Sequence, residues 1–131
     1  MKHEIKDLVY IGFGCQKHFK PTVWKYAKEM MELAVKNGLA RPFNFGRGKG
    51  KYATDLKMIE IVDGLAKIPE AHEIAERFAA YKYRCRKQLD EAIQERKKDA
   101  AQEALDILWK SQSMSFGYAA HVQEQINRME A

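Results

Sequence analysis

The sequence predicts a mainly α-helical protein, a compact bundle of about five helices with a short strand or β-hairpin in its N-terminal half. Apolar residues recur at helical spacing over most of the chain after residue 20, which is typical of helices that bury one face. Between Glu70 and Phe116 the chain contains neither glycine nor proline, the two residues that most often interrupt helices. A length of 131 residues predicts one domain that spans the whole chain, 1–131.

Residues 4–13 are predicted to form a short strand. Val9, Ile11 and Phe13 alternate with other side chains, and the segment is rich in β-branched and aromatic residues, which favour strands. The spacing of apolar residues between positions 5 and 9 also fits a helical turn, so a helix is the alternative interpretation.

A helix is predicted to begin at Pro21, with Thr22 as its N-cap, because proline suits a first helical turn and threonine caps free amide groups. Seven apolar residues fall on one broad face at helical spacing: Val23, Trp24, Ala27, Met30, Met31, Ala34 and Val35. Asn37 and Gly38 follow, and a glycine at this place typically adopts the left-handed conformation that ends a helix. The segment is therefore expected to be a core helix.

The segment 41–52 is rich in glycine and basic residues and is predicted to form a loop between helices. Its flanks, residues 43–45 and 51–53, are expected to pair as a short β-hairpin with the glycines at its tip, and a flexible loop is the alternative. Thr54 and Asp55 are expected to cap the next helix. The predicted core face of that helix comprises Leu56, Met58, Ile59, Val62, Leu65 and Ala66.

Residues 70–113 are predicted to form either one long helix or two helices. Pro69 suits the first turn of this region. Large apolar side chains are absent around Asp99, and Asp99 and Gln102 have the spacing of a capping box, which favours a break near Asp99 over one rod. A last helix of about three turns is expected over residues 118–129.

Positive charge is concentrated in the first half of the chain. Residues 17–51 carry nine Lys and Arg against two Glu, a net charge of +7, whereas residues 88–131 carry five basic and eight acidic residues, a net charge of −3. A segregated field of this kind attracts polyanions or acidic protein surfaces. The charge pattern therefore predicts a negatively charged partner but does not distinguish a polyanion from an acidic protein.

The glycine-basic segment does not match nucleotide-binding loops. A P-loop requires Ser or Thr after its Gly-Lys pair, whereas Tyr52 follows Gly50 and Lys51 in this chain. A dinucleotide-binding fingerprint that began at Gly46 and Gly48 would need its third glycine where Lys51 stands. No cofactor is therefore predicted.

Cations interleaved with glycines and aromatic residues instead favour nucleic-acid binding. Long cationic side chains reach successive phosphates, glycines let the main chain approach closely, and an aromatic ring stacks on an unpaired base. A solvated turn whose aromatic rings pack inward is the alternative. The residues assigned to this surface are Arg41, Phe43, Phe45, Arg47, Lys49, Lys51 and Tyr52.

A second basic cluster lies in the middle of the long helical region, where no acidic residue occurs between positions 76 and 90. Spacings of three and four residues place its cations over one wide outer arc of a helix. The cluster is predicted to extend the nucleic-acid surface, and an ordinary solvated helix face is the alternative. The cations assigned to it are Lys82, Arg84, Arg86 and Lys87.

The sequence as a whole predicts a small, non-enzymatic, regulatory nucleic-acid-binding protein whose partner is DNA or RNA. The alternative is a protein-interaction module or inhibitor that docks the same basic surface on an acidic partner protein. Apolar residues over 71–93, at spacings between 3.5 and 3.6 residues per turn, also predict a seam through which two copies form a homodimer.

The sequence contains no catalytic motif, so no catalytic residue is predicted. Cys15 and His18 stand in C-x-x-H spacing, but a structural zinc site needs four ligands, and no metal is predicted. Two distant cysteines, without a signal peptide or an apolar run that could cross a bilayer, predict a cytoplasmic protein with free thiols and no membrane partner.

Overall fold

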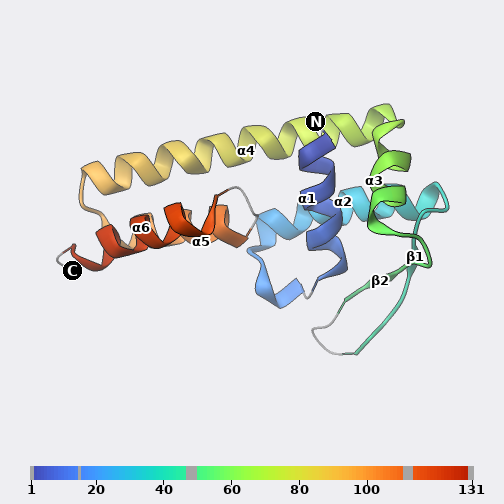
Figure 1. Ribbon diagram of the computed structural model, residues 1–131, viewed down its shortest axis with the longest axis horizontal. Coiled ribbons are helices and arrows are strands. Elements are labelled where there is room, and N and C mark those ends of the chain that lie inside the picture. Colours follow the sequence, from blue (N-terminus) through green and yellow to red (C-terminus); the bar gives the residue numbers. More distant parts are fainter. Residues whose placement is uncertain (1, 15, 47–49, 111–113, 130–131) are drawn as a thin grey trace. The chain divides into compact units, whose positions relative to one another are not determined.

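The computed structural model describes residues 2–14, 16–46, 50–110 and 114–129. Within these residues the chain is mainly α-helical, with six α-helices, one short 3-10 helix and one two-stranded antiparallel sheet (Figure 1). The predicted fold class is confirmed, with six helices where about five were expected. The chain divides into two compact units, residues 1–79 and 80–131, and the boundary falls within one helix. The single domain expected from chain length stays a prediction.

The first unit is built around helix α1 (Lys2–Phe13), which packs against α2 (Pro21–Lys36) and α3 (Met58–Ala66). The short 3-10 helix η1 (Gln16–His18) lies between α1 and α2 in the chain, and the first part of α4 (Pro69–Gln94) follows α3. The largest fully buried side chains of α1 are Ile5, Leu8 and Ile11. These side chains place α1 at the centre of the apolar core of this unit.

The predicted strand over residues 4–13 is wrong, because these residues belong to α1. Ile5, Leu8 and Val9 are separated by three and four residues, so a helix brings them to one side, and all three are fully buried. Tyr10 points away from this core and is 54% exposed. The content of β-branched residues favoured a strand, but packing against two helices outweighs that weak preference.

Helix α2 begins at Pro21 as predicted, but Thr22 is not its cap. Lys20 occupies the N-cap position in an extended conformation, without a side-chain capping bond. The other end is as predicted: Gly38 has a φ of 74°, and its N–H donates to the carbonyl of Val35 at 3.1 Å. This arrangement satisfies a carbonyl that would otherwise lack a partner at the helix end.

The two strands β1 (Arg41–Pro42) and β2 (Tyr52–Ala53) form the predicted hairpin, with the pairing displaced toward the beginning of the segment. Arg41 lies opposite Ala53, and Pro42 lies opposite Tyr52. The N–H of Phe43 also donates to the carbonyl of Lys51 at 2.8 Å, which continues the pairing beyond the strands. The hairpin packs against α1 through β2 and against α2 through β1.

Helix α3 begins at Met58, later than the predicted cap at Thr54 and Asp55. Lys57 is its N-cap residue, and the N–H of Lys57 donates to the Glu60 carboxylate at 3.1 Å. The predicted core face is also partly wrong, because Leu56 and Ile59 are 39% and 65% exposed. The buried residues of α3 are Ile61, Val62 and Leu65.

The second unit comprises the C-terminal part of α4, α5 (Lys98–Lys110) and α6 (Phe116–Asn127). The predicted break between two helices is confirmed, and it lies just before Asp99. Arg96 adopts a φ of 54°, and the N–H of Lys97 donates to the carbonyl of Ala92 at 2.8 Å. This hydrogen bond with a left-handed residue closes the end of α4 as a Schellman motif.

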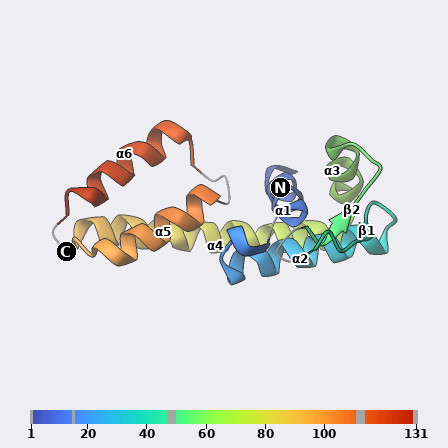
Figure 2. The same ribbon diagram turned by 90° about the horizontal axis from the view of Figure 1, so that it is seen from below.

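Helices α5 and α6 follow one another in the chain and pack on one another (Figure 2). Gln102 and Gln123 exchange reciprocal amide hydrogen bonds of 2.8 and 2.6 Å between the two helices. The apolar side chains buried in this unit include Leu105, Leu108, Val122 and Ile126. The predicted last helix is confirmed and begins slightly earlier than expected, with Ser115 as its N-cap.

The apolar stripe over residues 71–93, predicted as a dimer seam, is covered within the single chain. Phe78 and Leu89 are both fully buried, and the ring of Tyr26 contacts that of Phe78 at a centroid distance of 5.6 Å. The stripe therefore supplies buried side chains to each of the two units, and the homodimer stays a prediction.

Gly12→Ala is expected to destabilise the protein by about 1–3 kcal/mol, because overpacked cores cost free energy of this order. A Cβ at Gly12 would overlap Cγ of the buried Met31 and lie 2.8 Å from its sulfur atom. The matched control is Gly117→Ala in α6, where no neighbouring atom lies within 4 Å of the added carbon. The control is expected to change stability by less than about 0.5 kcal/mol, because Gly117 is exposed in the first turn of α6. Urea unfolding followed by circular dichroism measures both, and equal effects would contradict the close approach of α1 and α2.

Arg96→Gly is expected to raise the free energy of unfolding by about 0.5–1 kcal/mol, because glycine adopts a positive φ without steric cost. Arg96 is the one non-glycine residue with a positive φ among the described residues. The same urea titration measures the effect, and Lys97→Gly at the next position serves as the control. A loss of stability in Arg96→Gly comparable to that in the control would contradict the left-handed end of α4.

Candidate nucleic-acid interface

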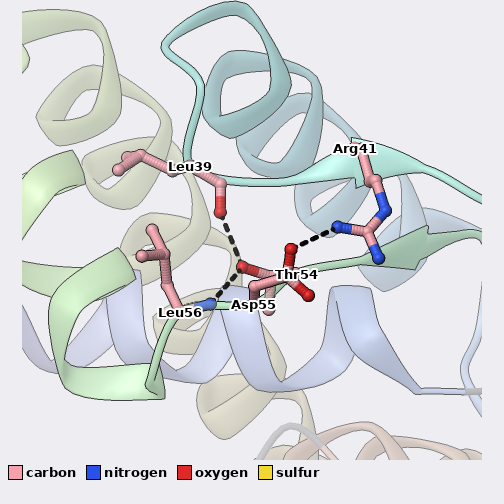
Figure 3. Close-up of polar contacts among 5 residues, drawn as sticks. All are labelled: Leu39, Arg41, Thr54, Asp55 and Leu56. Atoms are coloured by element: carbon pink, nitrogen blue, oxygen red, sulfur yellow. Dashed lines mark hydrogen bonds and ion pairs between the residues drawn. The ribbon is translucent and has the colours of Figure 1, made fainter.

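The base of the hairpin is held by the hydroxyl group of Thr54, as Figure 3 shows. Its Oγ1 donates to the carbonyl oxygen of Leu39 at 2.9 Å and accepts from the N–H of Leu56 at 3.1 Å. The first bond joins the two ends of the hairpin, which lie fifteen residues apart in the chain. Thr54 therefore closes the hairpin rather than capping a helix.

Arg41 pairs with Asp55 at the same end of the hairpin (Figure 3), with 2.9 Å between Nη1 and Oδ2. The two side chains are 54% and 87% exposed. An exposed pair of this kind contributes at most about 1 kcal/mol, so a phosphate group can compete with Asp55 for the guanidinium group. Arg41 is thus accessible, but part of its charge is already compensated.

Phe43 and Phe45 form an exposed aromatic pair on the hairpin. Their side chains are 48% and 50% exposed, and their ring centroids lie 4.4 Å apart with an interplanar angle of 50°. Residues separated by two positions in extended chain point to the same face, which explains the contact. Lys51 is exposed and bonded through its backbone to Phe43, so the hairpin combines a cation with two accessible rings.

Tyr52, the third aromatic residue assigned to the surface, lies in the core and is only 9% exposed. The pKa of its phenol is raised above the ordinary value, chiefly because burial disfavours the phenolate and also because Glu32 carries a negative charge nearby. Tyr52 therefore anchors the hairpin and offers little ring surface to a ligand.

Two glycines of the hairpin, Gly46 and Gly50, are required by its backbone geometry and packing. Gly46 has a φ of 114°, and its N–H donates to the side-chain oxygen of Asn44 at 3.0 Å. A Cβ on Gly50 would lie 3.1 Å from the carbonyl oxygen of Phe13. Turn geometry and close packing therefore require two of the glycines irrespective of ligand binding. The two other assigned cations, Arg47 and Lys49, lie outside the described residues.

The basic cluster on α4 belongs to the second unit, and three of its cations lie over tyrosine rings. The guanidinium carbon of Arg86 is 4.9 Å from the ring centroid of Tyr118 on α6. Arg84 is 6.0 Å from the ring of Tyr81, and Nζ of Lys87 is 6.0 Å from the ring of Tyr83. Lys82, the fourth cation, is half-buried.

Arg77 precedes this cluster in the sequence but is engaged in the first unit. Its two terminal nitrogens donate to both carboxylate oxygens of Glu29, each at 3.2 Å. The hydrogen bonds to Glu29 raise the pKa of the guanidinium group. A bidentate pair compensates the cation and fixes its direction, so Arg77 serves to join α2 and α4.

Three exposed aromatic residues of α5 and α6 were not assigned to a site. Trp109 is 42% exposed, and Phe116 and Tyr118 are 75% and 41% exposed. The rings of Trp109 and Phe116 contact one another at a centroid distance of 5.8 Å. The sequence carries no signal for this exposure, because it depends on how α5 and α6 pack.

The described residues contain no group of three or more His, Cys, Asp or Glu that could hold a metal ion. Cys85 is buried, and burial is the main reason that the pKa of its thiol is raised, which keeps the thiol protonated at neutral pH. Cys15 lies outside the described part of the chain. None of the helices in that part is long and apolar enough to cross a membrane.

No protein-family model, no curated protein and no solved structure matches this chain.

At high pH the Tyr52→Phe variant is expected to lose less stability than the wild-type protein does. A raised pKa in the folded state means that the stabilisation by the neutral phenol is fully present below the unfolded pKa, about 10, and is lost as pH rises through the folded pKa. Urea unfolding between about pH 8 and pH 11 brackets this transition. The same pH dependence in both proteins would contradict the burial of the phenol.

Proposed function

We propose that this protein binds nucleic acid through the hairpin over residues 41–53, without catalysing a reaction. The observation that carries the proposal is the exposed pair of Phe43 and Phe45 beside Lys51. About half of each side chain is left accessible to a ligand, and aromatic rings next to cations are the usual elements of a single-strand binding surface.

The cations of the hairpin supply the contacts to the phosphate backbone. Lys51 and Arg41 are exposed, and Arg47 and Lys49 lie between Gly46 and Gly50 in the sequence. Each phosphate that a cation neutralises releases condensed counterions, so binding is expected to weaken steeply with salt. Because the carboxylate of Asp55 already pairs with Arg41, the three other cations contribute most of this electrostatic attraction.

The basic face of α4 is the second contact surface of the proposal. Arg84, Arg86 and Lys87 carry their charge on exposed or half-exposed positions and lie against tyrosine rings rather than carboxylates. Their positive charge is therefore not compensated by these partners. A regulatory role and a cytoplasmic location are part of the proposal and rest on the sequence.

A protein-interaction module or inhibitor is the second candidate function. The observation that favours it is the exposed contact of Trp109 with Phe116, which lines a hollow of about 200 Å³ together with Leu105 and Ala119. Tryptophan is enriched among the residues that dominate protein interfaces. An acidic partner would use the same basic surfaces as nucleic acid, so capture from a lysate before and after nuclease treatment separates the two candidates.

Lys49→Glu with Lys51→Glu is expected to weaken binding of a labelled single strand about tenfold or more at moderate salt, because two phosphate contacts are lost. The slope of log Kd against log salt is expected to fall by about 1.5. Fluorescence anisotropy at about 50 to 200 mM salt measures both quantities. The matched control is Lys6→Glu with Lys25→Glu, which makes the same change in net charge at exposed positions of α1 and α2.

Three outcomes decide this proposal. Equal weakening in the hairpin variant and in the control would show that only net charge matters and would remove the hairpin as a site. Unchanged binding of both DNA and RNA in a folded hairpin variant would contradict the proposal directly. Retention of a protein from a nuclease-treated lysate, lost in the hairpin variant, would support the acidic-partner alternative in its place.

A further inference from the structure

The second unit carries a strip of exposed tyrosines and cations on the outer side of α4. At about 100° per residue, Tyr83, Arg86 and Lys87 fall within an arc of about 100° on the helix. Cys85 and Leu89, on the other side, are buried, so this arc faces outward. Tyr83 is 65% exposed, which leaves most of its ring accessible.

Tyr118 extends the strip from α4 onto the first turn of α6. Its ring lies 4.9 Å from the guanidinium carbon of Arg86, at one edge of the arc, and the side chain of Tyr118 is 41% exposed. Tyr83 lies near the centre of the arc, and Nζ of Lys87, at the other edge, is 6.0 Å from its ring centroid. The order across the arc is therefore ring, cation, ring and cation, contributed by two helices.

We infer that Tyr83 and Tyr118, with Arg86 between them and Lys87 beside Tyr83, form a base-stacking surface for unpaired nucleic acid. The inference rests on the proposed function and names its ligand class, a single strand. Every base presents a π-face that a tyrosine ring or a guanidinium plane can stack on, but only an unpaired base exposes that face to a protein surface.

The cations of the strip fit the phosphates of the same strand. Arg86 and Lys87 are held against rings, which restrict their side chains without neutralising their charge. No acidic residue lies between Glu76 and Asp90. These two acids are seven residues before and after Tyr83, hence on the same side of α4, and they limit the strip to a few nucleotides.

Other occupants fit these observations less well. A second copy docked on the strip by a two-fold axis would bring Arg86 and Lys87 against the same cations of its partner, which repel one another. An acidic peptide would pair with the two cations but would leave the exposed rings of Tyr83 and Tyr118 without a specific partner. A single strand uses both kinds of side chain.

The test compares two double variants of the full chain, Tyr83→Leu with Tyr118→Leu and Tyr83→Phe with Tyr118→Phe. Leucine keeps apolar bulk but removes the π-face, whereas phenylalanine keeps the ring. The leucine variant is expected to bind a labelled oligothymidine of about twelve nucleotides about tenfold or more weakly, and the phenylalanine variant within about twofold of the wild type. The salt slope of the leucine variant is expected to stay unchanged, because no phosphate contact is removed. Circular dichroism and thermal unfolding confirm that both variants are folded.

The outcomes separate this inference from the proposed function. Equal binding by the leucine and wild-type proteins, with the salt slope still sensitive to Lys49→Glu and Lys51→Glu, would overturn the stacking surface and leave the hairpin proposal standing. Tighter binding of the matching duplex than of the single strand would overturn the ligand class. No binding of either would overturn both proposals. Displacement of the strand by polyglutamate, with the leucine variant unaffected, would assign the strip to an acidic protein instead.

Discussion

The hairpin depends on how closely helix α1 approaches its neighbours. Gly12 lets α1 pack on the fully buried Met31 of α2, at a spacing that a side chain on Gly12 would prevent. One residue later, the carbonyl of Phe13 lies against Gly50, where an added Cβ would be 3.1 Å away. The end of α1 therefore supports the returning arm of the hairpin. Because a packed core resists small displacements, this contact fixes which residues of the hairpin face water.

Most helices could be predicted from residue spacing, and the errors have a common cause. Ile5, Leu8 and Val9 suit a helix by their spacing and a strand by their residue type, and only packing against α2 and α3 decides between the two. The hydroxyl of Thr54 suits a helix cap by type, yet it donates to Leu39, far away in the sequence. Local patterns do not reveal partners that the chain brings together only by folding.

The residue types of the candidate site could be predicted, but their exposure could not. Opposed residues of an antiparallel pair share one face, so the pairing of Pro42 with Tyr52 turns Tyr52 to the side opposite Phe43. A shift of the register by one residue would exchange these faces, and composition does not specify the register. Tyr118 was missed for a related reason, since its contact with Arg86 joins two helices that are distant in the sequence.

Some cations of this protein are neutralised by carboxylates and stabilise the fold, whereas others keep their charge available for a ligand. The side chain that each cation contacts separates the two groups. Arg77 is held by both oxygens of Glu29, so its charge is compensated and its direction is fixed. Arg86 and Lys87 lie against tyrosine rings, which attract them through the ring quadrupole and leave the full positive charge to act on a phosphate. Arg41 is intermediate, because its exposed pair with Asp55 contributes little and can be exchanged. All these side chains contribute equally to the net charge of the chain. A polyanion, however, would interact most strongly with the cations that lack a carboxylate partner.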